Sequence, residues 1–175
     1  MSRLEDLPSW PVRHLVDAIG STDHAPGGGA AGAVAIALAA ACARKAILIT
    51  LKRRPGDAEL EAKGVRLGLI ADAALESAAG DAVAFAALIA AYQQPHDSEP
   101  AAAARKAAIR ARAASTAQVG VDLKALAIET RSILNAIEGV ISPVMANDIS
   151  AAVALVAAGE QIQDDNIREN GKAGG

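Results

Sequence analysis

Apolar residues recur at helical spacing along almost the whole chain of 175 residues. A first short helix is predicted over residues 11–20, because Pro11 suits a first helical turn, apolar positions follow three and four apart, and Gly20 ends the pattern. Residues 21–29 are predicted to form a loop, followed by a long helix over residues 30–52. Apolar residues lie on all sides of this second helix, so we expect other helices to enclose it.

The rest of the chain continues this pattern of long helices separated by glycine and proline. Gly80 divides one helical stretch into two predicted segments, and we expect an interruption near Gly120, because a glycine inside a helix costs about 1 kcal/mol relative to alanine. A turn is predicted at residues 139–143 and a disordered tail at residues 172–175. The predicted helices cover residues 57–79, 81–92, 99–138 and 144–168.

Together these elements predict an all-α fold, a single-domain bundle of long alanine-rich helices over residues 1–171. Alanine, the strongest helix former, makes up about a quarter of the sequence, whereas aromatic residues amount to 2%. A sandwich, a barrel or a sheet-rich enzyme is therefore excluded. Because a core of small side chains removes little apolar area per residue, we expect the helices to bury further area against a second subunit, as a homodimer.

Charge and cysteine content narrow the partners and the compartment. The net charge is −3 at pH 7 and no basic arm carries interleaved aromatic residues, so we expect no nucleic-acid binding. The single cysteine, Cys42, cannot form an internal disulfide. Acidic residues precede the first long apolar stretch, which argues against a signal peptide, and we expect a cytoplasmic protein.

One uncharged stretch, residues 25–43, has the length of a membrane span. It consists mostly of glycine and alanine, which are far less lipophilic than leucine, and it opens with a loop-like Pro-Gly-Gly-Gly sequence. We therefore expect a buried core helix and no membrane association.

A glycine-rich sequence at residues 27–32, Gly-Gly-Gly-Ala-Ala-Gly, satisfies the spacing G-x-G-x-x-G of dinucleotide-binding loops. That site needs a preceding strand, whereas residues 21–26 are polar and contain a proline. Two interpretations remain open. The turn into a long helix presents free backbone N–H groups and the positive end of the helix dipole to an anion, or the glycines only permit close helix packing and an unusual turn.

Two carboxylates in apolar surroundings are candidates for acid-base chemistry. Asp81 lies among alanine, glycine and valine, and Asp148 precedes an equally apolar stretch. Burial would raise the pKa of such a group and prepare it for proton transfer. The simpler interpretation is that Asp81 follows Gly80 as a helix N-cap and that Asp148 lies in the first turn of the last helix. The three histidines show no ligand spacing, so no metal site is expected.

Four short motifs follow one another in a distinctive order. They are Pro26-Gly27-Gly28-Gly29 before an alanine-rich helix, Asp81 with Ala84-Phe85 and Ala91-Tyr92 up to Pro95, Asn147-Asp148, and Asn166-Ile167-Arg168 with Asn170. In this order they resemble the cyclodeaminase/cyclohydrolase family, which includes the C-terminal domain of formiminotransferase-cyclodeaminase. The resemblance spans nearly the whole chain and implies an all-helical domain that dimerises and binds a reduced folate in a groove at the dimer.

The resemblance also implies a chemistry. Family members convert formiminotetrahydrofolate to methenyltetrahydrofolate with release of ammonia, or hydrolyse methenyltetrahydrofolate to formyltetrahydrofolate. The reacting carbon is already activated, so no cofactor is expected, and the reduced folate is the substrate. By this resemblance Asp81 and Asp148 are the candidate catalytic groups. The candidate substrate-binding residues are Pro26, Gly27, Gly28, Gly29, Asn147, Asn166, Arg168 and Asn170.

Some positions depart from the family pattern. Ala30 stands where the family usually has a serine, and residues 142–148 replace an Asn-Pro-Asn-Ala-like stretch before the aspartate. We predict a methenyltetrahydrofolate cyclohydrolase, because no formiminotransferase domain is fused to deliver a formimino substrate. The alternatives are a formiminotetrahydrofolate cyclodeaminase and a non-catalytic helical subunit for folate binding or assembly.

Overall fold

The computed structural model describes residues 3–173, and every regular element within them is a helix. Four long helices make the body of the fold. A short 3₁₀ helix and a short α-helix precede them, and a second 3₁₀ turn leads into the last helix. The elements are η1 (Leu4–Ser9), α1 (Val12–Ile19), α2 (Gly28–Leu51), α3 (Ala58–Tyr92), α4 (Glu99–Ala136), η2 (Pro143–Met145) and α5 (Ala146–Ala173). The predicted all-α fold is confirmed.

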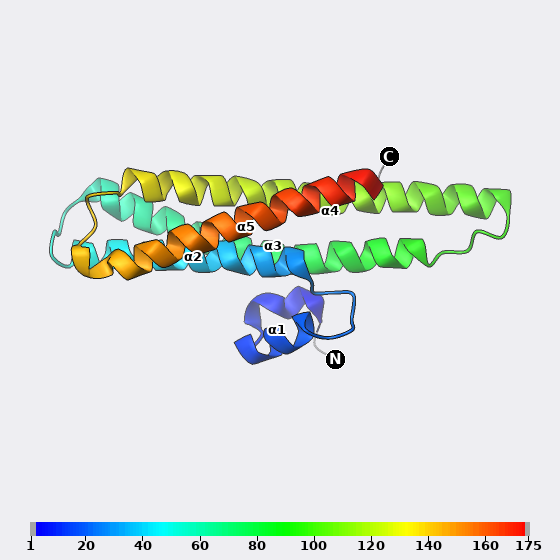
Figure 1. Ribbon diagram of the computed structural model, residues 1–175, viewed down its shortest axis with the longest axis horizontal. Coiled ribbons are helices and arrows are strands. Elements are labelled where there is room, and N and C mark those ends of the chain that lie inside the picture. The colour runs from blue at the N-terminus through cyan, green and yellow to red at the C-terminus, as the bar shows by residue number, and fades with distance from the viewer. Residues whose placement is uncertain (1–2, 174–175) are drawn as a thin grey trace.

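The four long helices pack as an elongated bundle (Figure 1). Helix α2 packs against α3 and α5, and α4 packs against the same two helices. The end of α3 and the start of α4 extend beyond α2 and α5 as a projecting two-helix hairpin. The 3₁₀ helix η1 packs on α3, whereas α1 lies outside the bundle with the Val12 and Val16 side chains exposed.

Side-chain caps begin two of the long helices. The Asp57 carboxylate accepts a hydrogen bond from the backbone N–H of Leu60 at 3.0 Å, at the start of α3. The Ser98 hydroxyl oxygen accepts one from Ala101 at 3.4 Å, at the start of α4. A cap of this kind stabilises a helix by about 1 kcal/mol. Helix α2 begins differently, because its N-cap residue, Gly27, has no side chain to cap with.

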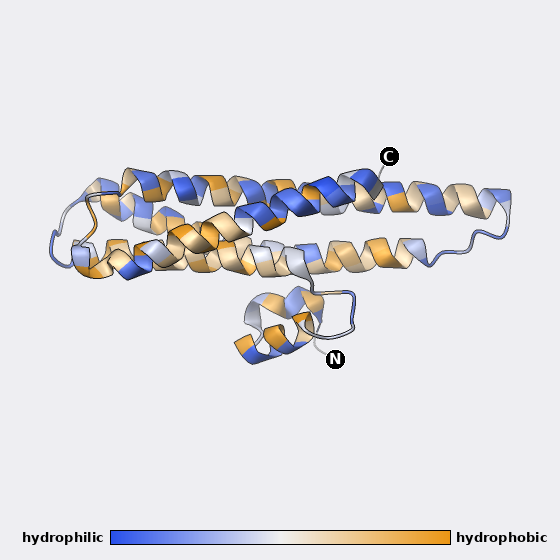
Figure 2. Ribbon diagram, in the orientation of Figure 1, coloured by the Kyte–Doolittle hydropathy of each residue, from blue (hydrophilic) through white to orange (hydrophobic). Residues whose placement is uncertain are grey.

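Alanine and a few large aliphatic residues form the core. Helix α2 contributes Ile36 and Ile47, both fully buried, with buried alanines between them. Apolar residues follow the whole length of α2, whereas polar residues gather on α4 and on the end of α5 (Figure 2). Small side chains let helix axes approach closely, so the bundle is tight although it holds few large residues.

Helices α2 and α5 approach each other closely at two glycines, Gly32 and Gly159. A Cβ atom on Gly159 would lie 2.6 Å from Cγ1 of Ile36 and 3.0 Å from the backbone oxygen of Gly32. The first distance is shorter than real Cβ contacts, and the second is a tight contact with backbone that cannot rotate away. This crossing therefore requires glycine at position 159.

Two predicted interruptions are wrong. Helix α3 continues through Gly80 and α4 continues through Gly120, because packing along both sides of these helices outweighs the cost of a glycine, about 1 kcal/mol. At Gly120 a Cβ atom would lie 3.0 Å from Cγ1 of Ile167 on α5. The missing side chain therefore serves the contact between α4 and α5.

The ends of α2 and α5 also differ from the prediction. Helix α2 begins at Gly28, two residues early, so the last two glycines of the expected loop are helical. Helix α5 runs through Ala173, which makes the predicted tail wrong at Lys172 and Ala173. The other two residues of that tail, 174–175, lie outside the described residues.

Helices α2 and α3 are each long and apolar enough to cross a membrane, by length and composition alone. In the fold they lie against each other, and α2 also packs on α5 while α3 also packs on α4. Core helices of a helical bundle have this composition too, and 44% of the apolar stretch of α2 is buried inside the fold.

We expect the substitution Gly159→Ala to lower the free energy of unfolding by about 1–3 kcal/mol, because the added methyl group must push α2 and α5 apart. Gly80→Ala is the matched control: nothing lies within 4 Å of a Cβ atom at that position. It should stabilise α3 by about 0.5–1 kcal/mol. Urea unfolding of both variants checks the pair, and equal effects would contradict the close crossing.

Candidate active site

The N-terminus of α2 meets a carboxylate from α3. The side chain of Asp81 accepts a hydrogen bond from the backbone N–H of Ala30, in the first turn of α2. Asp81 is buried, with 6% of the residue exposed. Its carboxylate thus caps a helix that has no cap of its own, and it lies at the positive end of the helix dipole. The interpretation of Asp81 as the N-cap of its own helix is wrong, because α3 is continuous there.

This contact depends on the absence of a side chain at Gly29. A Cβ atom there would lie 2.4 Å from both carboxylate oxygens of Asp81 and 2.6 Å from Nδ2 of Asn166. The two interpretations of the glycine-rich loop therefore hold together. The glycine permits a close approach, and the anion received by the helix N-terminus is the chain's own carboxylate.

A buried amide joins α5 to the same junction. Gln163 is completely buried, and its Nε2 donates a hydrogen bond to the backbone oxygen of Gly29 at 3.2 Å. Its Oε1 accepts one from Nδ2 of Asn166 at 3.4 Å. A Cβ atom on Gly32 would lie 2.7 Å from Nε2 of Gln163, so this glycine makes room for the amide. Three helices are tied together around Asp81.

Burial raises the pKa of Asp81 to about 6, and the hydrogen bond from Ala30 offsets only part of this rise. Among residues 3–173, Asp81 has no ion-pair partner. A carboxyl group that leaves water without gaining a cation binds its proton more tightly. Both protonation states are therefore populated near neutral pH, as proton transfer in both directions requires.

The Asp81 carboxylate faces a pocket of about 170 Å³ where α2, α3, α4 and α5 meet. Backbone of the glycine-rich loop forms one wall, Phe85 gives an apolar wall, and carboxamides from α5 add polar groups. The pocket is smaller than the roughly 300–1,000 Å³ of typical ligand sites, so it fits only part of a larger substrate. The lining residues are Gly27, Gly28, Gly29, Asp81, Phe85, Thr116, Asn166, Glu169 and Asn170.

Comparison with known proteins shows to which family the chain belongs. The family model for formiminotransferase-cyclodeaminase matches residues 11–173. The chain belongs to this family. Among solved structures, formiminotetrahydrofolate cyclodeaminase from Thermotoga maritima is similar to it with a TM-score of 0.81 and 22% sequence identity, over 93% of this chain and 79% of that chain. At this identity the likeness shows the fold alone. No functionally curated protein matches the sequence.

Within this formiminotransferase-cyclodeaminase fold, the two carboxylates proposed as catalytic lie apart in the chain. Asp148 is in the first turn of α5, where its Oδ1 accepts a hydrogen bond from Nζ of Lys45 at 2.8 Å. Along α5, 18 residues separate it from Asn166, a span of about 27 Å at 1.5 Å per residue. Asp148 and its neighbour Asn147 therefore do not join the Asp81 pocket of their own chain.

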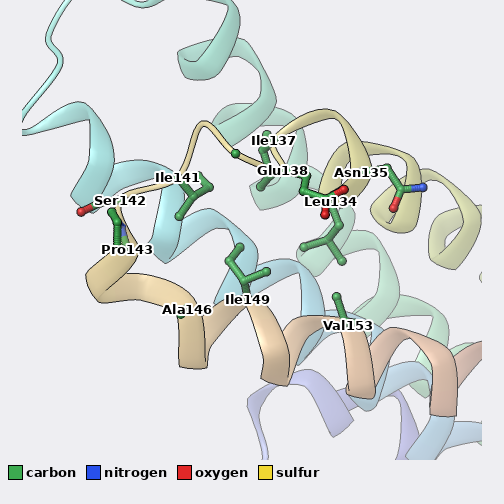
Figure 3. Close-up of a pocket in the computed structure, with 11 residues that line it drawn as sticks. Leu134, Asn135, Ile137, Glu138, Ile141, Ser142, Pro143, Ala146, Ile149 and Val153 are labelled. Atoms are coloured by element: carbon green, nitrogen blue, oxygen red, sulfur yellow. The ribbon is translucent and has the colours of Figure 1, made fainter.

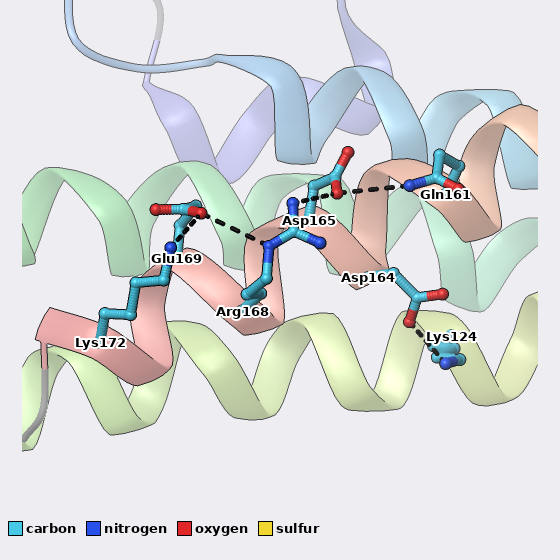
Figure 4. Close-up of polar contacts among 7 residues, drawn as sticks. All are labelled: Lys124, Gln161, Asp164, Asp165, Arg168, Glu169 and Lys172. Carbon is cyan, nitrogen blue, oxygen red and sulfur yellow. Dashed lines mark hydrogen bonds and ion pairs between the residues drawn. The ribbon is translucent and has the colours of Figure 1, made fainter.

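Of the other predicted substrate-binding residues, some line the Asp81 pocket and two, Pro26 and Arg168, do not. Gly27, Gly28, Gly29, Asn166 and Asn170 line the pocket. Pro26 is buried but does not line the pocket. Arg168 forms ion pairs on its own helix, at 2.6 Å to Asp165 and 3.5 Å to Glu169 (Figure 4). Its guanidinium is thus already engaged on the surface of α5.

Sequence reasoning missed Gln163, Thr116 and Glu169. Gln163 had a signal, because it continues the buried stripe of α5 at helical spacing from Val156 and Gly159. A polar residue on a core stripe needs a buried partner. Thr116 and Glu169 had none, since their places follow only from how α4 and α5 cross.

A larger pocket of about 310 Å³ lies between the end of α4 and the start of α5 (Figure 3). Aliphatic side chains such as Leu134, Ile141 and Ile149 line it, and its carboxylate, Glu138, is exposed. It holds no buried titratable group, so it is not the candidate active site. Residues 3–173 contain no group of three or more acidic, histidine or cysteine side chains placed to hold a metal ion.

Replacing Asp81 with asparagine should stabilise the protein at pH 7.5 and not at pH 4. The folded-state pKa of Asp81, about 6, lies above its ordinary value of 3.8. The folded state thus binds the proton more tightly, and its stability falls as pH rises through this range. The variant avoids that loss, which is about 3 kcal/mol at most for a shift of about two units.

Urea unfolding at the two pH values, at one protein concentration, measures the difference. The exposed Asp97→Asn variant is the control and should leave the pH dependence of the wild type unchanged. A gain for Asp81→Asn that is equal at both pH values would show that the carboxyl group is not destabilised by burial.

Proposed function

We propose that this chain closes the formimino group of formiminotetrahydrofolate into a methenyl bridge and releases ammonia. Membership of the formiminotransferase-cyclodeaminase family supports this reaction, as does the shared fold of a formiminotetrahydrofolate cyclodeaminase. The observation that carries the proposal is Asp81, a buried carboxyl group with a pKa of about 6 at a pocket of fitting chemistry. The sequence favoured the cyclohydrolase, whereas the comparisons favour the cyclodeaminase.

The reaction needs one group that first accepts a proton and then returns it. The folate nitrogen N10 attacks the protonated formimino carbon, and a base must remove the N10 proton. The amino nitrogen must then receive a proton so that it leaves as ammonia. Asp81 can do both, because it takes the N10 proton as a carboxylate and delivers it to the amino group as an acid. Charge and atoms balance, since a cationic substrate gives the methenyl cation and neutral ammonia.

Electrostatics favour the last step. When Asp81 gives up its proton, the carboxylate forms next to the new methenyl cation, and the opposite charges stabilise each other in a site shielded from water. The hydrogen bond from Ala30 holds the carboxylate in place meanwhile. The carboxamides of Asn166 and Asn170 can orient the pteridine ring, whose edge offers both donors and acceptors.

A pocket of about 170 Å³ holds the reacting end of such a substrate and not the whole folate. The remainder then lies on the surface outside the pocket, along α4 or α5. This placement leaves the binding of the distal part to exposed side chains, while the buried part fixes the geometry of proton transfer.

Ammonia release from formiminotetrahydrofolate tests the proposal directly. We expect turnover by the wild type above the uncatalysed rate and a loss of about 10²-fold or more for Asp81→Asn, which cannot transfer the proton. Asp148→Asn is the control, because Asp148 pairs with Lys45 away from the pocket, and it should keep kcat within a few-fold. Asp81→Asn with unchanged turnover would remove Asp81 from the mechanism.

The cyclohydrolase reaction is tested by the absorbance of methenyltetrahydrofolate. In that reaction water replaces N10 as the attacking group, and Asp81 would remove its proton. If the chain has this second activity, the absorbance of methenyltetrahydrofolate falls faster with the enzyme than without it. Folate binding without turnover in either assay would support the non-catalytic subunit and overturn the proposal.

A further inference from the structure

The buried amide of Gln163 is held in one position by the helices around it. Its side chain projects from α5, is completely buried, and is faced by glycines of two other helices. A Cβ atom on Gly32 of α2 would lie 2.7 Å from Nε2, and one on Gly120 of α4 would lie 3.7 Å from Oε1. Because the packing is this close on both sides, the amide has no space in which to turn over.

A backbone oxygen decides which end of this amide points where. The backbone oxygen of Gly29 can only accept a hydrogen bond, so the atom of Gln163 that faces it at 3.2 Å is the Nε2 donor. The other end is then the acceptor Oε1, which faces Nδ2 of Asn166 at 3.4 Å. Asn166 thus turns its donor toward Gln163. Its Oδ1 accepts no hydrogen bond within residues 3–173 and is the end left for the pocket.

The polar side chains nearest to Asn166 in the pocket also offer acceptors. The hydroxyl group of Thr116 donates its hydrogen to the backbone oxygen of Arg112 at 2.9 Å, so only its lone pairs remain for a ligand. Asp81 adds a carboxylate, and none of the described residues that line the pocket is lysine, arginine or histidine. A cationic group with N–H donors suits this set of oxygens.

We infer that Gln163 is a positioning residue that keeps Oδ1 of Asn166 toward the pocket, and that Asn166 thereby selects a substrate whose reacting carbon bears =NH₂⁺ over one that bears =O. A Cβ atom on Gly29 would touch both Asn166 and Asp81. The amide of Asn166 therefore lies beside the carboxyl group that transfers the proton, and Asn170 is left for the pteridine ring.

The inference rests on the proposed function, because the formimino group supplies the N–H donor that Oδ1 needs. A formyl group has the same size but offers only oxygen lone pairs, so it would meet Oδ1 as acceptor against acceptor. The methenyl carbon bears no N–H group at all. A site built around a hydrogen bond to the substrate discriminates strongly against an analogue that lacks the donor, since its own polar group is then left without a partner.

Exchange of =NH₂⁺ for =O at one carbon tests this selection, and 5-formyltetrahydrofolate makes that exchange. The measurements are KM for the formimino substrate and Ki for the formyl compound as a competitor. We expect the wild type to prefer the formimino substrate by about 10-fold or more, as one hydrogen bond to a charged group supplies. Gln163→Met should reduce this ratio by about 10-fold, because the amide of Asn166 is then free to turn. A purely structural loss weakens both ligands alike, whereas here the formyl compound binds no more weakly than before.

Two further variants keep the test decisive. Gln161→Met is the matched control, because Gln161 is exposed on the same helix, and it should leave the ratio unchanged. Asn166→Leu removes Oδ1 itself and leaves the core residue in place. It should lower the ratio as Gln163→Met does, and the double variant should lower it no further. A ratio that Asn166→Leu leaves unchanged, or equal binding of both ligands by the wild type, overturns the inference while the proposed function stands.

Side-chain hydrogen exchange measured by NMR tests the contact without ligand or turnover. The Nδ2 protons of Asn166 should exchange with water more slowly than those of the exposed Asn135, and Gln163→Met should remove that protection. The signal is assigned by its absence in Asn166→Leu. A wild type that releases no ammonia contradicts the proposed function alone. Equal exchange at Asn166 in the wild type and in Gln163→Met overturns the positioning role of Gln163.

Discussion

The rest of the fold depends on one contact, the hydrogen bond between the Asp81 carboxylate and the backbone N–H of Ala30 in the first turn of α2. Helix α2 starts with glycines and has no side-chain cap, so its free N–H groups must find a partner outside the helix. The partner comes from α3, and Gly29 leaves the space for it. Gln163 then ties α5 to the same backbone. One polar junction thus fixes the positions of three helices that are otherwise joined by small apolar side chains.

At this junction the group that suits proton transfer, a buried carboxyl, lowers the stability of the fold. A buried carboxyl group without a cation is unfavourable at neutral pH, and a neutral amide would hold the helices together at lower cost. Keeping an acid there gives a group that changes protonation state near neutral pH. The raised pKa therefore follows from the same burial that makes the packing possible.

Much of the fold followed from the sequence because helical periodicity and caps are local. The predicted helix starts at residues 57 and 99 lie within one residue of the observed starts, Ala58 and Glu99, where the side chains of Asp57 and Ser98 provide the caps. The interruptions predicted at Gly80 and Gly120 are wrong, because packing in the assembled bundle outweighs the cost of about 1 kcal/mol for a glycine inside a helix. Of the candidate site, the glycine loop, Asp81, Asn166 and Asn170 come together. Asp148 does not join them, because it lies at the other end of the same helix as Asn166, a separation that the predicted helix over residues 144–168 already implied. Gln163 stayed unnoticed since its importance lies in a backbone oxygen on another helix.

The projecting hairpin gives the molecule unequal rigidity along its length. Helix α2 begins and α5 ends close to the Asp81 pocket, and α3 and α4 continue from there as the projecting two-helix hairpin (Figure 1). Segments with fewer packed partners open at lower free energy than the rest of a fold. The side of the pocket next to the hairpin is therefore expected to open at a lower free energy than the junction around Asp81.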